Sequence, residues 1–173
     1  MENINQPIST IYACLQRLIG LHRQLWETVK MEHESLVQAE LKGIQEATSA
    51  KQACLEMIRQ TESDRLKALG ELALLWKKPV KELTLNQIIL LVQDQDMKSS
   101  EQLRSTLNAL TILIKRVSEQ NQANQVLVEK SLEHVHEMKK NVLGESVPKS
   151  NTYTAQGQRV NGSTGARLIS KEA

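Results

Sequence analysis

Apolar residues recur every three or four positions along most of this chain, which predicts helices rather than strands. Between positions 7 and 144 the only residues that break helices are Gly20, Gly43, Gly70 and Pro79. Helices with so few breaks should be long. The first stripe consists of Ile8, Ile11, Leu15, Leu18, His22, Leu25, Val29, Glu32 and Leu36. A face of this spacing is what one helix presents to a partner helix.

The spacing shifts between Leu36 and Leu41, where a step of five residues interrupts the stripe. We predict a tight turn at Gln38–Glu40 that joins two helices, although no Gly or Pro marks it; one continuous, kinked helix is the alternative. The second helix should end before Pro79, because a proline disfavours helical geometry in the residue that precedes it. Its expected buried stripe is Leu55, Ile58, Leu66, Leu69, Leu72 and Trp76.

Thr84 and Gln87 have the spacing of a capping box and precede a short apolar helix at 88–92, which should cover one end of the helical pair. Ser99 and Gln102 form a second such pair before the last helix. The stripe of that helix is Leu103, Leu107, Leu110, Ile114, Val117, Asn121, Asn124, Val128, Ser131, Val135, Met138 and Val142. Gly144 and Pro148 should end it.

These elements predict an all-α protein of long antiparallel helices. A helical hairpin, a short helix and a long third helix would pack as a coiled-coil-like bundle. Residues 1–144 should form this helical domain. Residues 145–173 are rich in Ser, Thr, Asn, Gln and Gly, so they should form a flexible C-terminal tail.

Composition and net charge argue against several classes of function. Aromatic residues make up 2% of the chain and Phe is absent, which suits narrow aliphatic seams between helices. A net charge of +2 gives no case for binding nucleic acid or an anionic membrane. No signal peptide or membrane span is recognisable, and Cys14 and Cys54 fit reduced, buried thiols. We therefore expect a cytoplasmic protein that is not a membrane protein.

No residue pattern predicts catalysis. His134 and His136 lie two apart and would point in different directions on a helix, so they should not share a metal ion. His33, between Glu32 and Glu34, should lie on a solvated, charged stretch. We expect no catalytic residues, no metal and no cofactor, and hence a binding protein rather than an enzyme.

Asn121 and Asn124 occupy stripe positions of an otherwise aliphatic helix. They could fix the alignment of packed helices, or the seam could open there towards a ligand; the two interpretations are about equal. A broad apolar surface follows them on the same helix, formed by Val126, Leu127, Val128, Leu132, Val135 and Met138. This surface could pack on the first hairpin, pair with a second copy in a homo-oligomer, or bind an amphipathic partner helix.

Three segments resemble the flagellar export chaperones of the FlgN family. They are EHESLVQAELKGIQEATSAKQACL at 32–55, NQANQVLVEKSLEHV at 121–135 and TYTAQGQ at 152–158. The first resembles the family's turn between its first two helices, where Gln38–Glu40 departs from the usual Asp or Gly. The second resembles the last helix, and the third an element of the family's tail.

The resemblance implies a chaperone that binds the C-terminal helical segments of hook–filament junction proteins and delivers them to the type III export gate. It implies that the client face comprises Asn121, Asn124, Val126, Leu127, Val128, Leu132, Val135 and Met138. It also implies that Tyr153 docks on the cytoplasmic domain of the gate protein FlhA. Judged from the residues alone, a homodimeric structural or signalling coiled coil remains the alternative.

Overall fold

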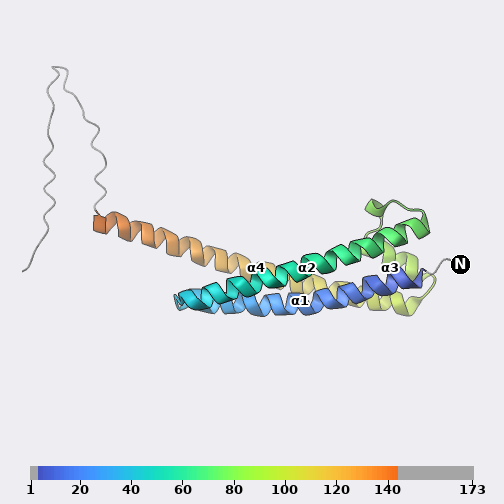
Figure 1. Cartoon of the computed structure of the whole chain (residues 1–173), viewed down its shortest axis with the longest axis horizontal. Helices are drawn as coiled ribbons and strands as arrows, with labels where there is room; N and C mark the ends of the chain where they lie inside the picture. The colour runs from blue at the N-terminus through green and yellow to red at the C-terminus, as the bar shows by residue number, and fades with distance from the viewer. Residues whose placement is uncertain (1–3, 144–173) are drawn as a thin grey trace, which may run out of the picture. The chain divides into compact units, whose positions relative to one another are not determined.

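The computed structural model describes residues 4–143 and confirms an all-α fold. The elements in order are α1 (Asn5–Val37), α2 (Leu41–Trp76), the 3-10 helix η1 (Val80–Glu82), α3 (Leu85–Gln93) and α4 (Met97–Leu143) (Figure 1). The chain divides into two units, Met1–Ser131 and Leu132–Ala173. The expected helix stop at Gly144 and Pro148 and the expected tail at 145–173 lie outside the described residues.

The predicted turn at Gln38–Glu40 is confirmed, and it makes α1 and α2 a hairpin. Ala39 adopts φ = 53°, its amide donates to the carbonyl of Leu36, and the amide of Glu40 donates to that of Ser35 at 2.9 Å. These two bonds define a Schellman motif, which usually has glycine at the left-handed position. Alanine fills that position here, which explains why no glycine marked the turn.

α2 ends at Trp76, three residues before Pro79, and a left-handed residue follows this helix end too. Lys77 adopts φ = 52°, and the amide of Lys78 donates to the carbonyl of Ala73 at 3.0 Å. The Thr84 cap is confirmed, because its hydroxyl accepts from the amide of Gln87. The predicted cap at Ser99 is wrong: α4 begins at Met97, and Asp96 accepts from the amides of Lys98 and Ser99.

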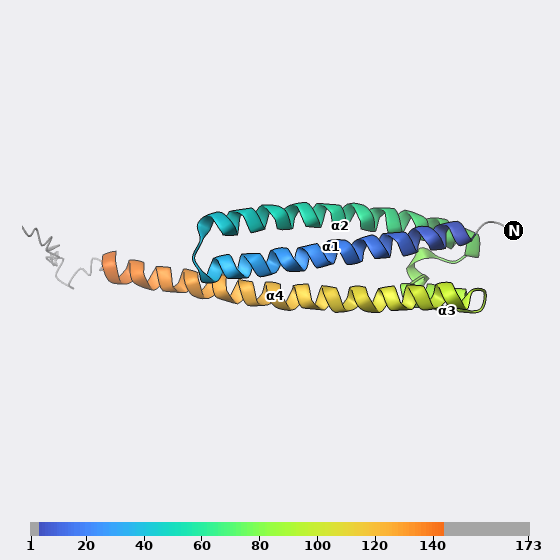
Figure 2. The same cartoon turned by 90° about the horizontal axis from the view of Figure 1, so that it is seen from below.

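Within Met1–Ser131, α4 runs in the same direction as α1 and lies beside it (Figure 2). The hydrogen-bonded pairs Gln16–Thr106 and His33–Asn124 are 90 and 91 residues apart in sequence. A nearly constant separation along two helices means that they are parallel. Of the two helices of the hairpin, α4 is therefore antiparallel to α2.

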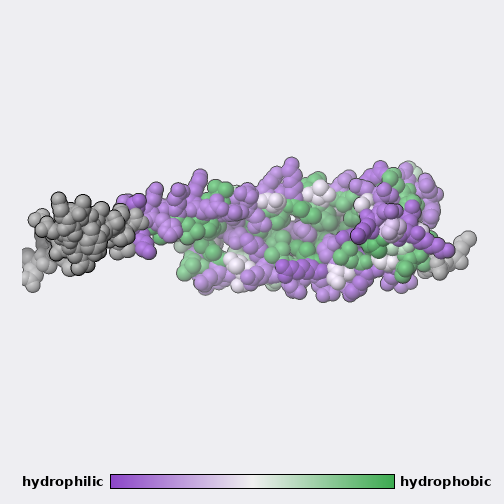
Figure 3. All heavy atoms as spheres, turned by 90° about the horizontal axis from the view of Figure 1, so that it is seen from above, coloured by the Kyte–Doolittle hydropathy of each residue, from purple (hydrophilic) through white to green (hydrophobic). Residues whose placement is uncertain are grey.

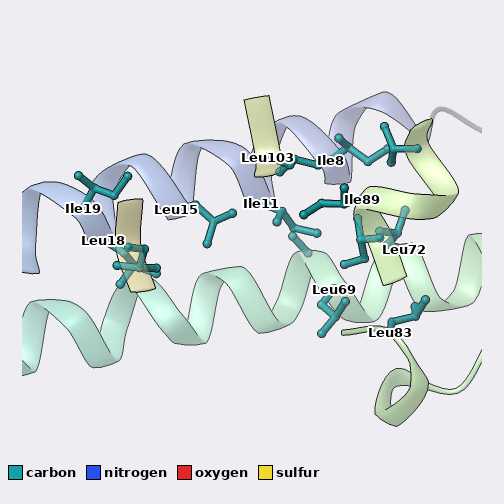
Figure 4. Packing of buried hydrophobic residues seen from close by; sticks show 14 of the residues in the cluster. Ile8, Ile11, Leu15, Leu18, Ile19, Leu69, Leu72, Leu83, Ile89 and Leu103 are labelled. Atoms are coloured by element: carbon teal, nitrogen blue, oxygen red, sulfur yellow. The ribbon is translucent and has the colours of Figure 1, made fainter. Parts of the chain in front are cut away.

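The main aliphatic core lies where α3 meets the hairpin and the start of α4, as predicted for the short apolar helix. Ile11 and Leu15 of α1, Leu72 of α2, Ile88 of α3 and Leu103 of α4 are nearly inaccessible to solvent (Figure 4 shows this cluster). A second, smaller cluster follows along the bundle and consists of Leu25, Val29, Cys54 and Val117. The aliphatic core thus becomes thinner towards the turn of the hairpin.

The predicted stripe of α2 is confirmed at Leu69 and Leu72, which are buried in the core, but it is wrong at two positions. Leu55 and Leu66 are exposed, with 39% and 52% of their surface accessible. Small residues at intervals of seven are buried instead: Ala47, Cys54, Thr61 and Ala68. Small side chains let the backbones of α1 and α2 approach closely along this part of α2, and Leu55 and Leu66 face outwards there.

Candidate partner-binding site

A polar network joins three helices near the turn of the hairpin. Asn124 of α4 is 4% exposed, and its side chain bonds to residues of α1. Its amide nitrogen donates to the carbonyl of Val29 at 3.0 Å and to the carboxylate of Glu32 at 2.9 Å. Its amide oxygen lies 2.9 Å from Nδ1 of His33 and accepts from Gln120 at 3.3 Å. Both ends of the Asn124 amide are therefore satisfied.

Lys51 connects α2 to the same network. Its Nζ donates to both carboxylate oxygens of Glu32 at 2.7 Å, and both side chains are mostly buried. A buried pair of this kind adds little net stability, because desolvation offsets the attraction, but removing one partner is costly. The network thus favours one arrangement of the three helices. For Asn124, this supports the interpretation that it fixes helix alignment.

Two grooves open beside this network, and they share Asn121 and Gln125. The first, which we call the middle groove, has a volume of about 340 Å³ and includes His22 and Leu25 of α1 and Ile114 of α4. The second, the tip groove, has a volume of about 380 Å³ and includes Leu36 of α1, Ile44 of α2 and Val128 of α4. Together they extend along α4 on the side where Asn121 is partly exposed.

The polar network forms the floor of the tip groove. Glu32, Lys51 and Asn124 line the groove, and each of these side chains is mostly buried. Gln125 and Glu129 are exposed and form its rim, with Gln125 donating to Glu129 at 2.9 Å. The groove therefore has apolar walls, a charged floor and a polar rim. For Asn121, this arrangement supports the second interpretation, that it lines an opening.

The apolar stripe of α4 continues as exposed side chains. Val128, Leu132, Val135, Met138 and Val142 are between 38% and 79% exposed. At 100° per residue, these five positions fall within about 120° of the helix circumference. Figure 3 shows one face of the molecule, on which apolar side chains gather around the middle of its length between hydrophilic borders. An in-phase, exposed apolar stripe is the kind of face that an amphipathic partner helix covers.

The predicted client residues do not share one face. Val126 and Val128 are about 200° apart around α4, so Val126 lies on the opposite side from the stripe. Leu127 is half-buried. Asn124 is committed to α1, whereas Leu132, Val135 and Met138 stand exposed along the stripe. Tyr153 lies outside the described residues.

The sequence did not reveal His33 and Lys51 as members of the polar network, nor Gln125 and Glu129 as members of the groove rim. His33 is half-buried against Asn124, so its expected place on a solvated stretch was wrong. One signal was present in the sequence: Glu32 occupies a position in the apolar stripe, where a carboxylate requires a partner. Only the fold identifies that partner as Lys51, 19 residues away.

Other chemistry is sparse in residues 4–143. Burial raises the pKa of the thiols of Cys14 and Cys54, which reduces their reactivity. No group of three His, Cys, Asp or Glu side chains in this range is placed to hold a metal ion. Over the same range, no helix combines the length and apolar character needed to cross a membrane.

The comparison with protein families matches residues 1–161 to the model described as FlgN protein. The chain belongs to the FlgN family. This family consists of flagellar export chaperones, so the grooves and stripe belong to a chaperone that handles flagellar substrates. No curated protein and no solved structure matches the chain significantly.

Proposed function

We propose that this FlgN-family protein binds the C-terminal helical segments of hook–filament junction proteins and delivers them to the flagellar export gate. The observation that carries the proposal is the stripe from Val128 to Val142, whose side chains are apolar and exposed. A client segment without a fold of its own could become helical on this stripe.

The size of the stripe suits reversible binding. Covering Leu132, Val135, Met138 and Val142, the more exposed members of the stripe, contributes at most roughly 6–12 kcal/mol before costs. Loss of rotational and translational freedom and ordering of the client offset a large part of this gain. The resulting affinity is moderate, which is what a protein that must later release its client requires.

The client test is co-purification of the full chain with the C-terminal segments of the junction proteins, using two matched variants. Val135→Asp places a charge in the stripe and should abolish binding, with helicity by circular dichroism unchanged. Val126→Asp makes the same change on the opposite side of α4, about 180° from Val135. It should leave binding intact. Binding that survives Val135→Asp would place the client elsewhere.

We also propose that Tyr153 docks on the cytoplasmic domain of FlhA. Support for this comes from the sequence, where a single aromatic side chain stands in a polar stretch and can offer apolar area together with a hydroxyl. Tyr153→Ala should weaken binding to FlhA and spare binding of the junction segments. Equal loss of both would assign the tyrosine to the client site.

The competing function is a homodimer in which the stripe pairs with itself. A concentration series by analytical ultracentrifugation separates the two possibilities. The chaperone should form a complex of about one chain with one client segment. A tight homodimer that junction segments leave unchanged would refute the proposal.

A further inference from the structure

The tip groove is charged at its floor although its walls are apolar. Leu36, Ile44 and Val128 supply the walls, while Glu32 and Lys51 meet below them. A helix that covered this groove with only apolar side chains would remove water from these charges and return no hydrogen bond. Desolvation without compensation is unfavourable. The groove therefore disfavours a partner with a uniformly apolar face.

Among the charged groups of the groove, the remaining hydrogen-bonding capacity is mainly acceptor capacity, whereas the amides of Asn121 and Gln125 keep both donor and acceptor groups. The amide hydrogens of Asn124 are used by Val29 and Glu32, and its oxygen already has two partners. Two of the three N–H groups of Lys51 can point at Glu32, which leaves one free. The carboxylates of Glu32 and Glu129, by contrast, keep unused lone pairs.

The charges that line the tip groove also favour a partner with a cationic side chain. The ionised residues that line the tip groove are Glu32, Lys51 and Glu129, so their net charge is −1. Glu32 is neutralised by Lys51, whereas no cationic side chain among residues 4–143 pairs with Glu129. The neighbouring Lys42–Glu46 pair of α2 is balanced, and Lys30 of α1 pairs with Glu27. Glu129 is thus the carboxylate available to a partner.

We propose that the tip groove selects a partner helix that carries one basic side chain, Arg or Lys, within an otherwise apolar face. The apolar side chains pack on Leu36, Ile44 and Val128, and the cation bonds to Glu129 at the rim and faces Glu32 at the floor. This inference rests on the proposed function, since it specifies the chemistry of the client segment. It makes Glu129 a specificity-determining residue.

The test uses three synthetic amphipathic helical peptides that differ only at one central position of the apolar face: Arg, Leu or Glu. Isothermal titration against the full chain should rank them Arg, then Leu, then Glu, with about fivefold or more between the first and the last. High ionic strength should narrow this gap, because salt screens exposed charges.

Variants of the chain locate the effect. Glu129→Gln should narrow the gap between the Arg and Glu peptides, and Glu129→Arg should reverse their order. Glu119→Gln is the matched control, because Glu119 is an exposed carboxylate on α4 that pairs with Lys115 and does not line the groove. It should leave the ranking unchanged.

Two results would overturn the inference: equal affinity for the three peptides, or a gap that Glu129→Gln and Glu119→Gln change to the same extent. Failure of the proposed function has a different signature. If junction segments bind and Val135→Asp abolishes their binding, the proposed function stands whatever the peptide ranking. If neither junction segments nor any peptide binds, both proposals fail.

Discussion

Replacing Asn124 by alanine removes the centre of the polar network that joins α1, α2 and α4. Four groups lose a partner: the carbonyl of Val29, the carboxylate of Glu32, the ring of His33 and the amide of Gln120. The loss is not equal at each group. The Val29 carbonyl lies inside α1, where a helical amide also bonds to it, and Glu32 keeps Lys51.

The bond to the Glu32 carboxylate has the largest value, about 1.5–3 kcal/mol, because its acceptor is charged. The bond to Val29 contributes about 1 kcal/mol, and those to the half-buried His33 and Gln120 contribute less, because water can replace Asn124 there. We expect Asn124→Ala to lower the free energy of unfolding by about 2–4 kcal/mol.

Urea denaturation followed by circular dichroism measures this change, which corresponds to a lower midpoint by about 1–2 M. Asn121→Ala is the matched control, since Asn121 lies one turn away, is partly exposed, and its side chain makes no hydrogen bond to any of residues 4–143. It should change stability by less than about 0.5 kcal/mol. Equal effects of the two substitutions would refute the assignment of Asn124 as the alignment residue.

Three further predictions follow from the backbone and the core. Ala39→Gly should raise the free energy of unfolding by about 0.5–1 kcal/mol, because φ = 53° is strained for alanine and not for glycine. Urea denaturation measures this change, and an unchanged midpoint would mean that residue 39 is not left-handed. Ala68→Leu should destabilise the fold by about 1–3 kcal/mol, because the buried site has no room for the larger side chain. Leu66→Ala should change stability by less than about 1 kcal/mol, because Leu66 is exposed. Thermal melts in which Leu66→Ala is the more destabilising substitution would contradict the observed buried face of α2. Cys54 should react with a thiol reagent far more slowly in the folded chain than in urea, because burial hides the thiol and raises its pKa. Equal rates in the two conditions would mean that this part of the bundle is open.

Helix positions were accessible from the sequence because they depend on local periodicity. The short helix after Thr84, the stripe of α1 and the turn at Gln38–Glu40 each follow from residues within a few positions of one another. The cap of α4 was misplaced by three residues, since Asp96 competes with Ser99 for the same exposed amides and a carboxylate is the stronger acceptor.

The packing of α2 depended on its neighbour, and its sequence pattern was misleading. The predicted stripe was right at Leu69 and Leu72 but wrong at Leu55 and Leu66, because the close approach of α1 selects the face with Ala47, Cys54, Thr61 and Ala68. Which face of a helix is buried is decided by the space that the partner helix leaves. Local hydrophobicity contains no information about that space.

For the candidate site too, the sequence determined one part of the arrangement and the tertiary structure determined the rest. The sequence alone determined that the last helix carries an apolar stripe with Asn121 and Asn124 in it, because one helix periodicity defines a face. Only the tertiary structure decided that Asn124 is bound to α1 and that Asn121 lines an opening, although the two lie three residues apart. The deciding groups are the Val29 carbonyl and the Glu32 carboxylate, more than 90 residues away in sequence. Hydrogen bonds between distant segments form only after the helices have aligned, so no local pattern could specify them.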